Sequence, residues 1–281
     1  MNNKDMEFIS ELVKQLNPID DIMFRKMAEN KEFCRELLKT VMNDDALKVL
    51  EATPRLDITN LRGRSVILDA YCELGDGRRV DIEVQQANDD DHQRRVRYNT
   101  SLLTANITEK GEKFRQIPDV CSVFIAKFDI FKRGLAVYHI DRRVRETGEE
   151  AHNGLEEIYI NATANDGSVI SRLMRVYTET SVYDPDFPVT SGMKEQLKGT
   201  KEGHKTMCEI AEKLMSYGRV EGHMEGRMEG RMEGRMEGLN EGKTEAVIAF
   251  VKDGIITAEQ GAQRLKLTME EFEAKCKLYG E

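Results

Sequence analysis

The most regular alternation of hydrophobic and polar residues along the chain lies in the segment 66–85. It consists of two runs, 66–74 and 79–85, joined by the Gly-Asp-Gly loop 75–77. Two alternating runs on either side of a short glycine-containing loop predict a β-hairpin. Because side chains in a strand point to alternate faces, we expect the second strand to have one polar face and one buried hydrophobic face.

Acidic side chains gather on the expected polar face of this hairpin. In the second strand the face carries Asp81, Glu83 and Gln85. A three-residue loop places Asp69 directly across from Glu83, with Cβ atoms about 4.5–5.5 Å apart. Like charges at that distance repel unless a cation lies between them, and a hard ion such as Mg²⁺ accepts carboxylate oxygens and waters. This pairing depends on register, because a one-residue change in the loop would turn Asp69 to the opposite face.

The simpler interpretation of the same pattern is a solvated face of an antiparallel sheet. Asp69 argues against it, because it lies between Leu68 and Ala70 in a hydrophobic run. An acid in such a run is costly unless it has a partner or a function.

Hydrophobic spacing predicts the remaining elements of the first part of the chain. The helices are expected at 1–16, 20–43, 92–110, 169–179 and 194–217, and the strands at 120–130, 135–141 and 158–162, with a loop or edge strand at 54–60. A helix, a hairpin, a helix and then further strands indicate an α/β or α+β fold with a small mixed sheet.

The helix after the hairpin is the most basic segment of an acidic chain. Between His92 and Arg115 there are six Lys or Arg residues and two Glu residues, a net charge of +4. Arginines on such a helix, here Arg94, Arg95 and Arg97, are typical contacts to DNA phosphates. The alternative is a solvated helix face whose arginine stems cover the core.

Composition limits the protein class. The chain has 281 residues, a formal net charge of −9 and five cysteines without close pairing. These features indicate a reduced compartment and no zinc framework, and any nucleic acid must meet a local basic patch. No hydrophobic run approaches the ~18 residues of a membrane helix, so we expect a soluble, cytoplasmic protein that does not interact with a membrane.

We expect three parts: a domain at 1–188, a helical connector at 189–243 and a small helical module at 244–281. The connector contains Glu-Gly pairs every four residues from 221 to 241, with methionines in register. It is either a flexible linker or a helix that packs its glycine and methionine columns on a partner chain, and we favour self-association as a homo-oligomer through this C-terminal region. The module resembles a helix-turn-helix, but its acidic residues favour a packing or dimer role over DNA reading.

Several motifs occur in a recognisable order. They are Leu68-Asp69, the Asp-Ile-Glu-Val-Gln run at 81–85, the Asp-Ile-Met-Phe-Arg run at 21–25 and the basic segment 94–98. Together they resemble the PD-(D/E)XK nuclease superfamily, and within it the recombination-promoting nuclease (Rpn) or PD-(D/E)XK nuclease family transposase group. The resemblance covers roughly residues 17–180.

The resemblance implies a restriction-endonuclease-like core and a DNA endonuclease that uses Mg²⁺, with Mn²⁺ as a plausible substitute. Asp69, Glu83 and Gln85 would be catalytic. Asp69 and Glu83 would hold the metal with help from the Val84 carbonyl, and Asp81 would place a second metal or a water.

Two of the matched positions have further implications. Gln85 stands where relatives carry lysine, so the reaction would be slower or would depend on Arg94 or Arg97. Asp21 is either the N-terminal cap of its helix or, as in superfamily members, an extra acid near the metal.

Two other functions are compatible with the sequence. The first is a catalytically weak or inactive DNA-binding or regulatory oligomer that keeps the nuclease fold. The second is an interaction scaffold built on the Met-Glu-Gly repeat.

Overall fold

The computed structural model describes residues 3–213 and 242–278. Packing divides the chain into two compact units, Met1–Glu212 and Lys213–Glu281. The boundaries expected at 188 and 243, between the domain, the connector and the C-terminal module, stay predictions. Residues 221–241, which carry the Glu-Gly repeat, lie outside the described part of the chain. The expected self-association through this repeat therefore stays a prediction.

The first unit is built on one mixed sheet of six strands in the order β1-β2-β3-β4-β6-β5. The strands are β1 (Val49–Ile58), β2 (Val66–Leu74), β3 (Arg79–Gln85), β4 (Val120–Ala126), β5 (Val137–Ile140) and β6 (Leu155–Asn161). β3, β4 and β6 are parallel, and the other neighbouring pairs are antiparallel. The predicted mixed sheet is confirmed, and the segment expected as a loop or edge strand is the long edge strand β1.

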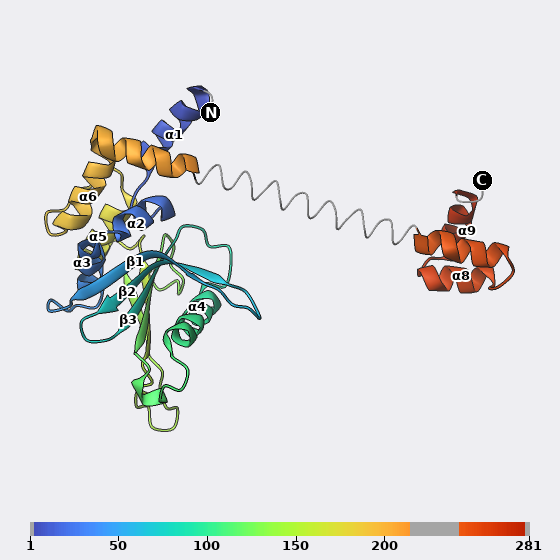
Figure 1. Ribbon diagram of the computed structural model, residues 1–281, viewed down its shortest axis with the longest axis horizontal. Coiled ribbons are helices and arrows are strands. Elements are labelled where there is room, and N and C mark those ends of the chain that lie inside the picture. Colours follow the sequence, from blue (N-terminus) through green and yellow to red (C-terminus); the bar gives the residue numbers. More distant parts are fainter. Residues whose placement is uncertain (1–2, 214–241, 279–281) are drawn as a thin grey trace. The chain divides into compact units, whose positions relative to one another are not determined.

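Helices flank this sheet (Figure 1). They are α1 (Asn3–Gln15), α2 (Asp21–Ala28), α3 (Lys31–Val41), α4 (His92–Ile107), α5 (Val169–Thr178) and α6 (Pro188–Gly199). A further helix over 201–213 follows α6, and a short 3-10 helix, η1 (Phe114–Gln116), lies between α4 and β4. The prediction of one helix over 20–43 is wrong. Asn30 interrupts it, because its side chain accepts a hydrogen bond from Glu32 N (3.0 Å) and caps a new helix.

The hairpin turn confirms the expected three-residue loop. Leu74 N donates to Arg78 O (3.0 Å) and Gly77 N donates to Leu74 O (3.1 Å). Gly77 has φ +97°, a conformation that only glycine adopts without strain. The ladder between β2 and β3 then pairs Glu73 with Arg79 and Ala70 with Ile82, so the register is the one that the loop length predicts.

The expected division of β3 into a polar and a buried face is wrong. Asp81 and Glu83 are as buried as the hydrophobic residues between them, with exposures of 0% and 1%. α4 covers the face of the sheet that carries Phe124 and Tyr159, while α2 and α3 pack against the other side of β1 and β2 (Figure 1). An interior strand between two helical layers exposes neither face.

The second unit is a small helical module. A helix over 242–252 is followed by α8 (Ala258–Leu265) and α9 (Met269–Leu278), around a core of Ile248, Ala262 and Phe272. Thr257 and Gln260 form the expected capping box at the start of α8. Within the described residues, no helix combines the length and hydrophobicity needed to cross a bilayer.

Candidate active site

Two carboxylates join β2 and β3 where their ladder ends. One step beyond the pair of Ala70 and Ile82, Asp69 lies opposite Glu83. Asp69 N donates to Glu83 Oε1 (3.4 Å), and Val84 N donates to Asp69 Oδ2 (3.0 Å). At this point hydrogen bonds from backbone N–H groups to the two carboxylates replace the backbone hydrogen bonds of the ladder. The two acidic side chains therefore lie between the strands.

A third acid, Asp81, lies one pleat away on β3 and is fully buried. Ser122 Oγ on β4 donates to its Oδ2 (3.2 Å), whereas Oδ1 has no hydrogen-bond partner among the described residues. Burial and the nearby Asp69 raise the pKa of Asp81 to about 7. Burial, followed by Asp81 and Asp69, raises the pKa of Glu83 well above its usual value. The cluster therefore strongly favours a positive charge beside it.

The first such charge comes from α2. Arg25 Nη2 lies 2.8 Å from Asp69 Oδ1, and Arg25 Nε lies 2.6 Å from Asp21 Oδ1. Burial and the neighbouring Asp69 raise the pKa of Asp21 to about 6. Asp21 therefore belongs to the acidic cluster, and Arg25 bridges it to Asp69 of the central pair.

The second charge comes from the first turns of α4. Arg95 Nη2 donates to Glu83 Oε2 (3.0 Å), and Arg95 Nη1 donates to Gln85 Oε1 (2.9 Å). The amide nitrogen of Gln85 donates to Ala87 O (2.9 Å). Arg95 is thus the cation at the position where Gln85 replaces the lysine expected from the resemblance.

Asp69, Arg25, Arg95 and Gln85 border a cavity of about 1060 Å³. Its wall also carries three further arginines and three acids, Arg64, Arg94, Arg97, Asp89, Asp90 and Asp91. Arg94 is paired with Asp91, with Nε 3.1 Å from Oδ2. Within the described part of the chain, Arg64 and Arg97 form no ion pair. Two guanidinium groups are therefore free to meet an anion in this cavity.

The structure brings together most of the residues that the sequence singles out. Asp69, Glu83 and Asp81 form one cluster, and the three arginines of α4 divide into Arg95 inside it and the other two on the cavity wall. In the part of the chain that the structure describes, no three His, Cys, Asp or Glu side chains form a ready metal cage. The metal and catalytic assignments stay predictions.

Two site residues are missing from the sequence-based assignment. Arg25 occurs there only as the last residue of a motif, and Arg64 does not occur at all. The motif at 21–25 placed an arginine one helical turn after Asp21, which was a usable signal for Arg25. Arg64 reaches the cavity through the fold of the β1–β2 turn, for which the sequence gives no local signal.

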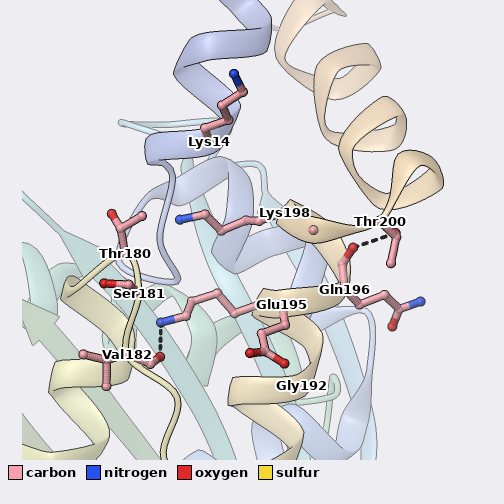
Figure 2. Close-up of a pocket in the computed structure, with 11 residues that line it drawn as sticks. Lys14, Thr180, Ser181, Val182, Gly192, Glu195, Gln196, Lys198 and Thr200 are labelled. Atoms are coloured by element: carbon pink, nitrogen blue, oxygen red, sulfur yellow. Dashed lines mark hydrogen bonds between the residues drawn. The ribbon is translucent and has the colours of Figure 1, made fainter.

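A second cavity, of about 810 Å³, lies among α1, α6 and the segment after α5, and it has a structural explanation (Figure 2). Lys194 is 2% exposed. Its Nζ donates to the carbonyls of Val176 (3.0 Å), Glu179 (3.0 Å) and Val182 (2.6 Å). The lysine thereby satisfies one carbonyl in the last turn of α5, that of its C-cap residue and one in the segment that follows, and its positive charge complements the helix dipole.

Comparison with known proteins agrees with this geometry. A family model described as PD-(D/E)XK nuclease family transposase matches residues 18–168, which is more than half of the chain. No curated protein and no solved structure gives a significant match. The mixed sheet with its flanking helices is a restriction-endonuclease-like core. This chain belongs to the PD-(D/E)XK nuclease family transposases.

Proposed function

We propose that the protein is a divalent-metal-dependent DNA endonuclease that hydrolyses phosphodiester bonds, with Mg²⁺ as its ion and Mn²⁺ as a substitute. Nucleases of this superfamily generally use divalent metals. The observation that carries the proposal is the meeting of Asp69 and Glu83 between two strands, beside a cavity lined by five arginines and four aspartates.

The acidic residues suit a hard divalent cation. Mg²⁺ is usually held by one or two carboxylates and completes its shell with water. Asp69 and Glu83 would supply the carboxylates, and the unpartnered Oδ1 of Asp81 would accept a hydrogen bond from a bound water or hold a second ion. Such an ion, held by Asp69 and Glu83, would supply Lewis-acid chemistry to the phosphodiester and would favour deprotonation of a bound water.

The arginines of the site have separate roles in this proposal. Arg25 positions Asp69, because it fixes Oδ1 while Val84 N fixes Oδ2. Arg95 supplies positive charge to the pentavalent phosphate of the transition state, which Gln85 cannot do. Arg64, Arg94 and Arg97 hold DNA phosphates on the cavity wall.

The test is the cleavage of supercoiled plasmid by the full chain in Mg²⁺. We expect Asp69→Asn and Glu83→Gln to reduce cleavage by at least about 10²-fold, since each removes a charge from the reacting centre. Glu51→Gln, which changes an exposed acid on β1, is the matched control and keeps full activity. Plasmid cut equally well by all four proteins would show that the site is assigned wrongly.

A specific observation favours a second function. Each central carboxylate is already neutralised by an arginine, at 2.8 Å and 3.0 Å, and the position of the expected lysine is uncharged. A regulatory DNA-binding protein that keeps the nuclease fold would have these features. It would retain DNA in a gel shift but leave plasmid intact in every divalent metal.

Self-association, the cytoplasmic location and the scaffold role of the Met-Glu-Gly repeat stay predictions. Sedimentation of the full chain and of a chain lacking 218–243 tests the first of them. An unchanged oligomer in the shortened chain would exclude this region as the interface. If the full chain does not shift DNA in the gel, the result would favour the scaffold role.

A further inference from the structure

The turn between β1 and β2 is braced by its own side chains. Asn60 Oδ1 accepts from Arg62 N (3.0 Å), and Ser65 Oγ accepts from Asn60 N (3.0 Å). Tyr98 of α4 donates to Arg64 O (2.6 Å) and accepts from Asn60 Nδ2 (3.2 Å). Figure 1 shows the tip of this hairpin projecting beside α4. Four hydrogen bonds, two of them to Tyr98, therefore hold the turn against α4.

The tip of the turn presents a hydrophobic side chain next to two arginines that follow it in the sequence. Leu61 is 95% exposed, more than any other large hydrophobic residue of the described chain. Arg62 follows it directly and Arg64 lies two residues further on, and neither has an ion pair within the described residues. A single exposed leucine is ordinary. A leucine at the tip of a hydrogen-bonded turn, next to two arginines, suits a partner with both hydrophobic and anionic groups.

The turn lies beside the acidic cluster. Arg64 and Val66 border the same cavity as Asp69. Leu61 lies eight residues before Asp69 along the chain, so the two are at most about 29 Å apart. This upper bound corresponds to about eight base pairs along B-form DNA.

We propose that Leu61 is a wedge that enters the minor groove of duplex DNA and separates a base step, with Arg62 and Arg64 on the flanking phosphates. Hydrophobic wedges of this kind partly unstack a step and bend the duplex. The bend would lie within about eight base pairs of the phosphodiester that the acidic cluster meets. This inference rests on the proposed function, in which duplex DNA is the substrate.

The bend can be measured without cleavage. A 30-bp duplex with a donor and an acceptor dye at its ends reports bending as an increase in energy transfer, in buffer without divalent metal. We expect the full chain to raise the transfer and Leu61→Ser to lose at least half of that rise, with affinity about 5-fold weaker. Leu61→Phe keeps a wedge and should keep the bend. Leu50→Ser is the control, because Leu50 is also exposed but lies at the other end of β1.

The outcomes separate this inference from the proposed function. Equal bending by the parent and Leu61→Ser, or cleavage of plasmid by a parent that does not bend DNA, overturns the wedge alone. Failure of the parent to bind the duplex overturns both the wedge and the DNA substrate. Loss of the bend in Leu61→Ser, but not in Leu50→Ser, supports the wedge.

Discussion

Arg25 and Asp69 form an ion pair of 2.8 Å although 44 residues of chain separate them. The Asp69 side chain is 6% exposed and that of Arg25 is 22% exposed, so water screens the pair poorly. The same guanidinium also contacts Asp21. One arginine from α2 therefore neutralises two acids of the site, and its removal leaves a buried charge without a partner.

Arg25→Ala should lower the free energy of unfolding by about 3 kcal/mol, since breaking a buried ion pair leaves one charge uncompensated. The measurement is urea unfolding in buffer without metal. Asp69→Asn in the same background should restore much of the loss, because no bare carboxylate remains. If the two substitutions destabilise additively in a double-mutant cycle, the pair does not couple as the geometry indicates.

Arg95→Ala should reduce plasmid cleavage by about 10²–10³-fold through loss of charge at the reacting phosphate. Gln85→Lys introduced into the Arg95→Ala protein should recover part of this activity, because it returns a cation to the same place. Arg94→Ala, whose arginine is paired with Asp91, is the comparison and should cost less than tenfold. A double variant as inactive as Arg95→Ala alone would contradict the proposed role of this charge.

Asp81 should make the protein less stable at pH 8 than at pH 5. Its folded pKa is raised to about 7, so the stability gained from the bound proton is complete below the unfolded pKa and is lost as pH rises through 7. Asp81→Asn should therefore stabilise the metal-free protein at pH 8 by on the order of 3 kcal/mol, with little gain at pH 4. Glu51→Gln should leave the pH dependence unchanged. An equal gain at both pH values would show that Asp81 is ionised throughout.

Arg64→Ala and Arg97→Ala should each weaken DNA binding for all sequences and reduce the salt slope of log K by about one, as loss of one phosphate contact does. The measurement is a titration of labelled duplex between 50 and 200 mM salt. Arg145→Ala is the control, because Arg145 is exposed in the loop before β6, at the opposite end of the parallel strands. If the salt slope of log K is the same in the parent and in all three variants, DNA does not bind at the wall of this cavity.

Lys194→Met should lower the free energy of unfolding by about 2–4 kcal/mol, because three carbonyls lose their donor and the end of α5 loses a nearby positive charge. Lys198→Met, which removes a single bond to Leu16 O, should cost less. Both can be measured by urea unfolding at pH 7. DNA cleavage per folded molecule should be the same in both variants, which would exclude this cavity from the active site.

Sequence periodicity determined the elements of the fold. The alternating runs around the loop 75–77 fixed the hairpin, and with it the register that brings Asp69 opposite Glu83. Both follow from chemistry within twenty residues: side chains alternate in a strand, and a three-residue loop allows one register. The interruption of the helix at Asn30 was also readable, because asparagine is a strong cap.

Only the tertiary structure decided the electrostatics of the site. The strand β3 is covered on both faces because α4 packs on one side of the sheet and α2 and α3 pack on the other. This burial changes the expected solvated acidic face into a buried cluster, in which the pKa values of Asp81 and Glu83 are raised. Arg25 and Arg64 come from distant segments, and which arginine of α4 meets Glu83 depends on the rotation of that helix. Local pattern fixes what lies nearby along the chain. Burial and charge pairing are set by residues that meet only after the chain has folded.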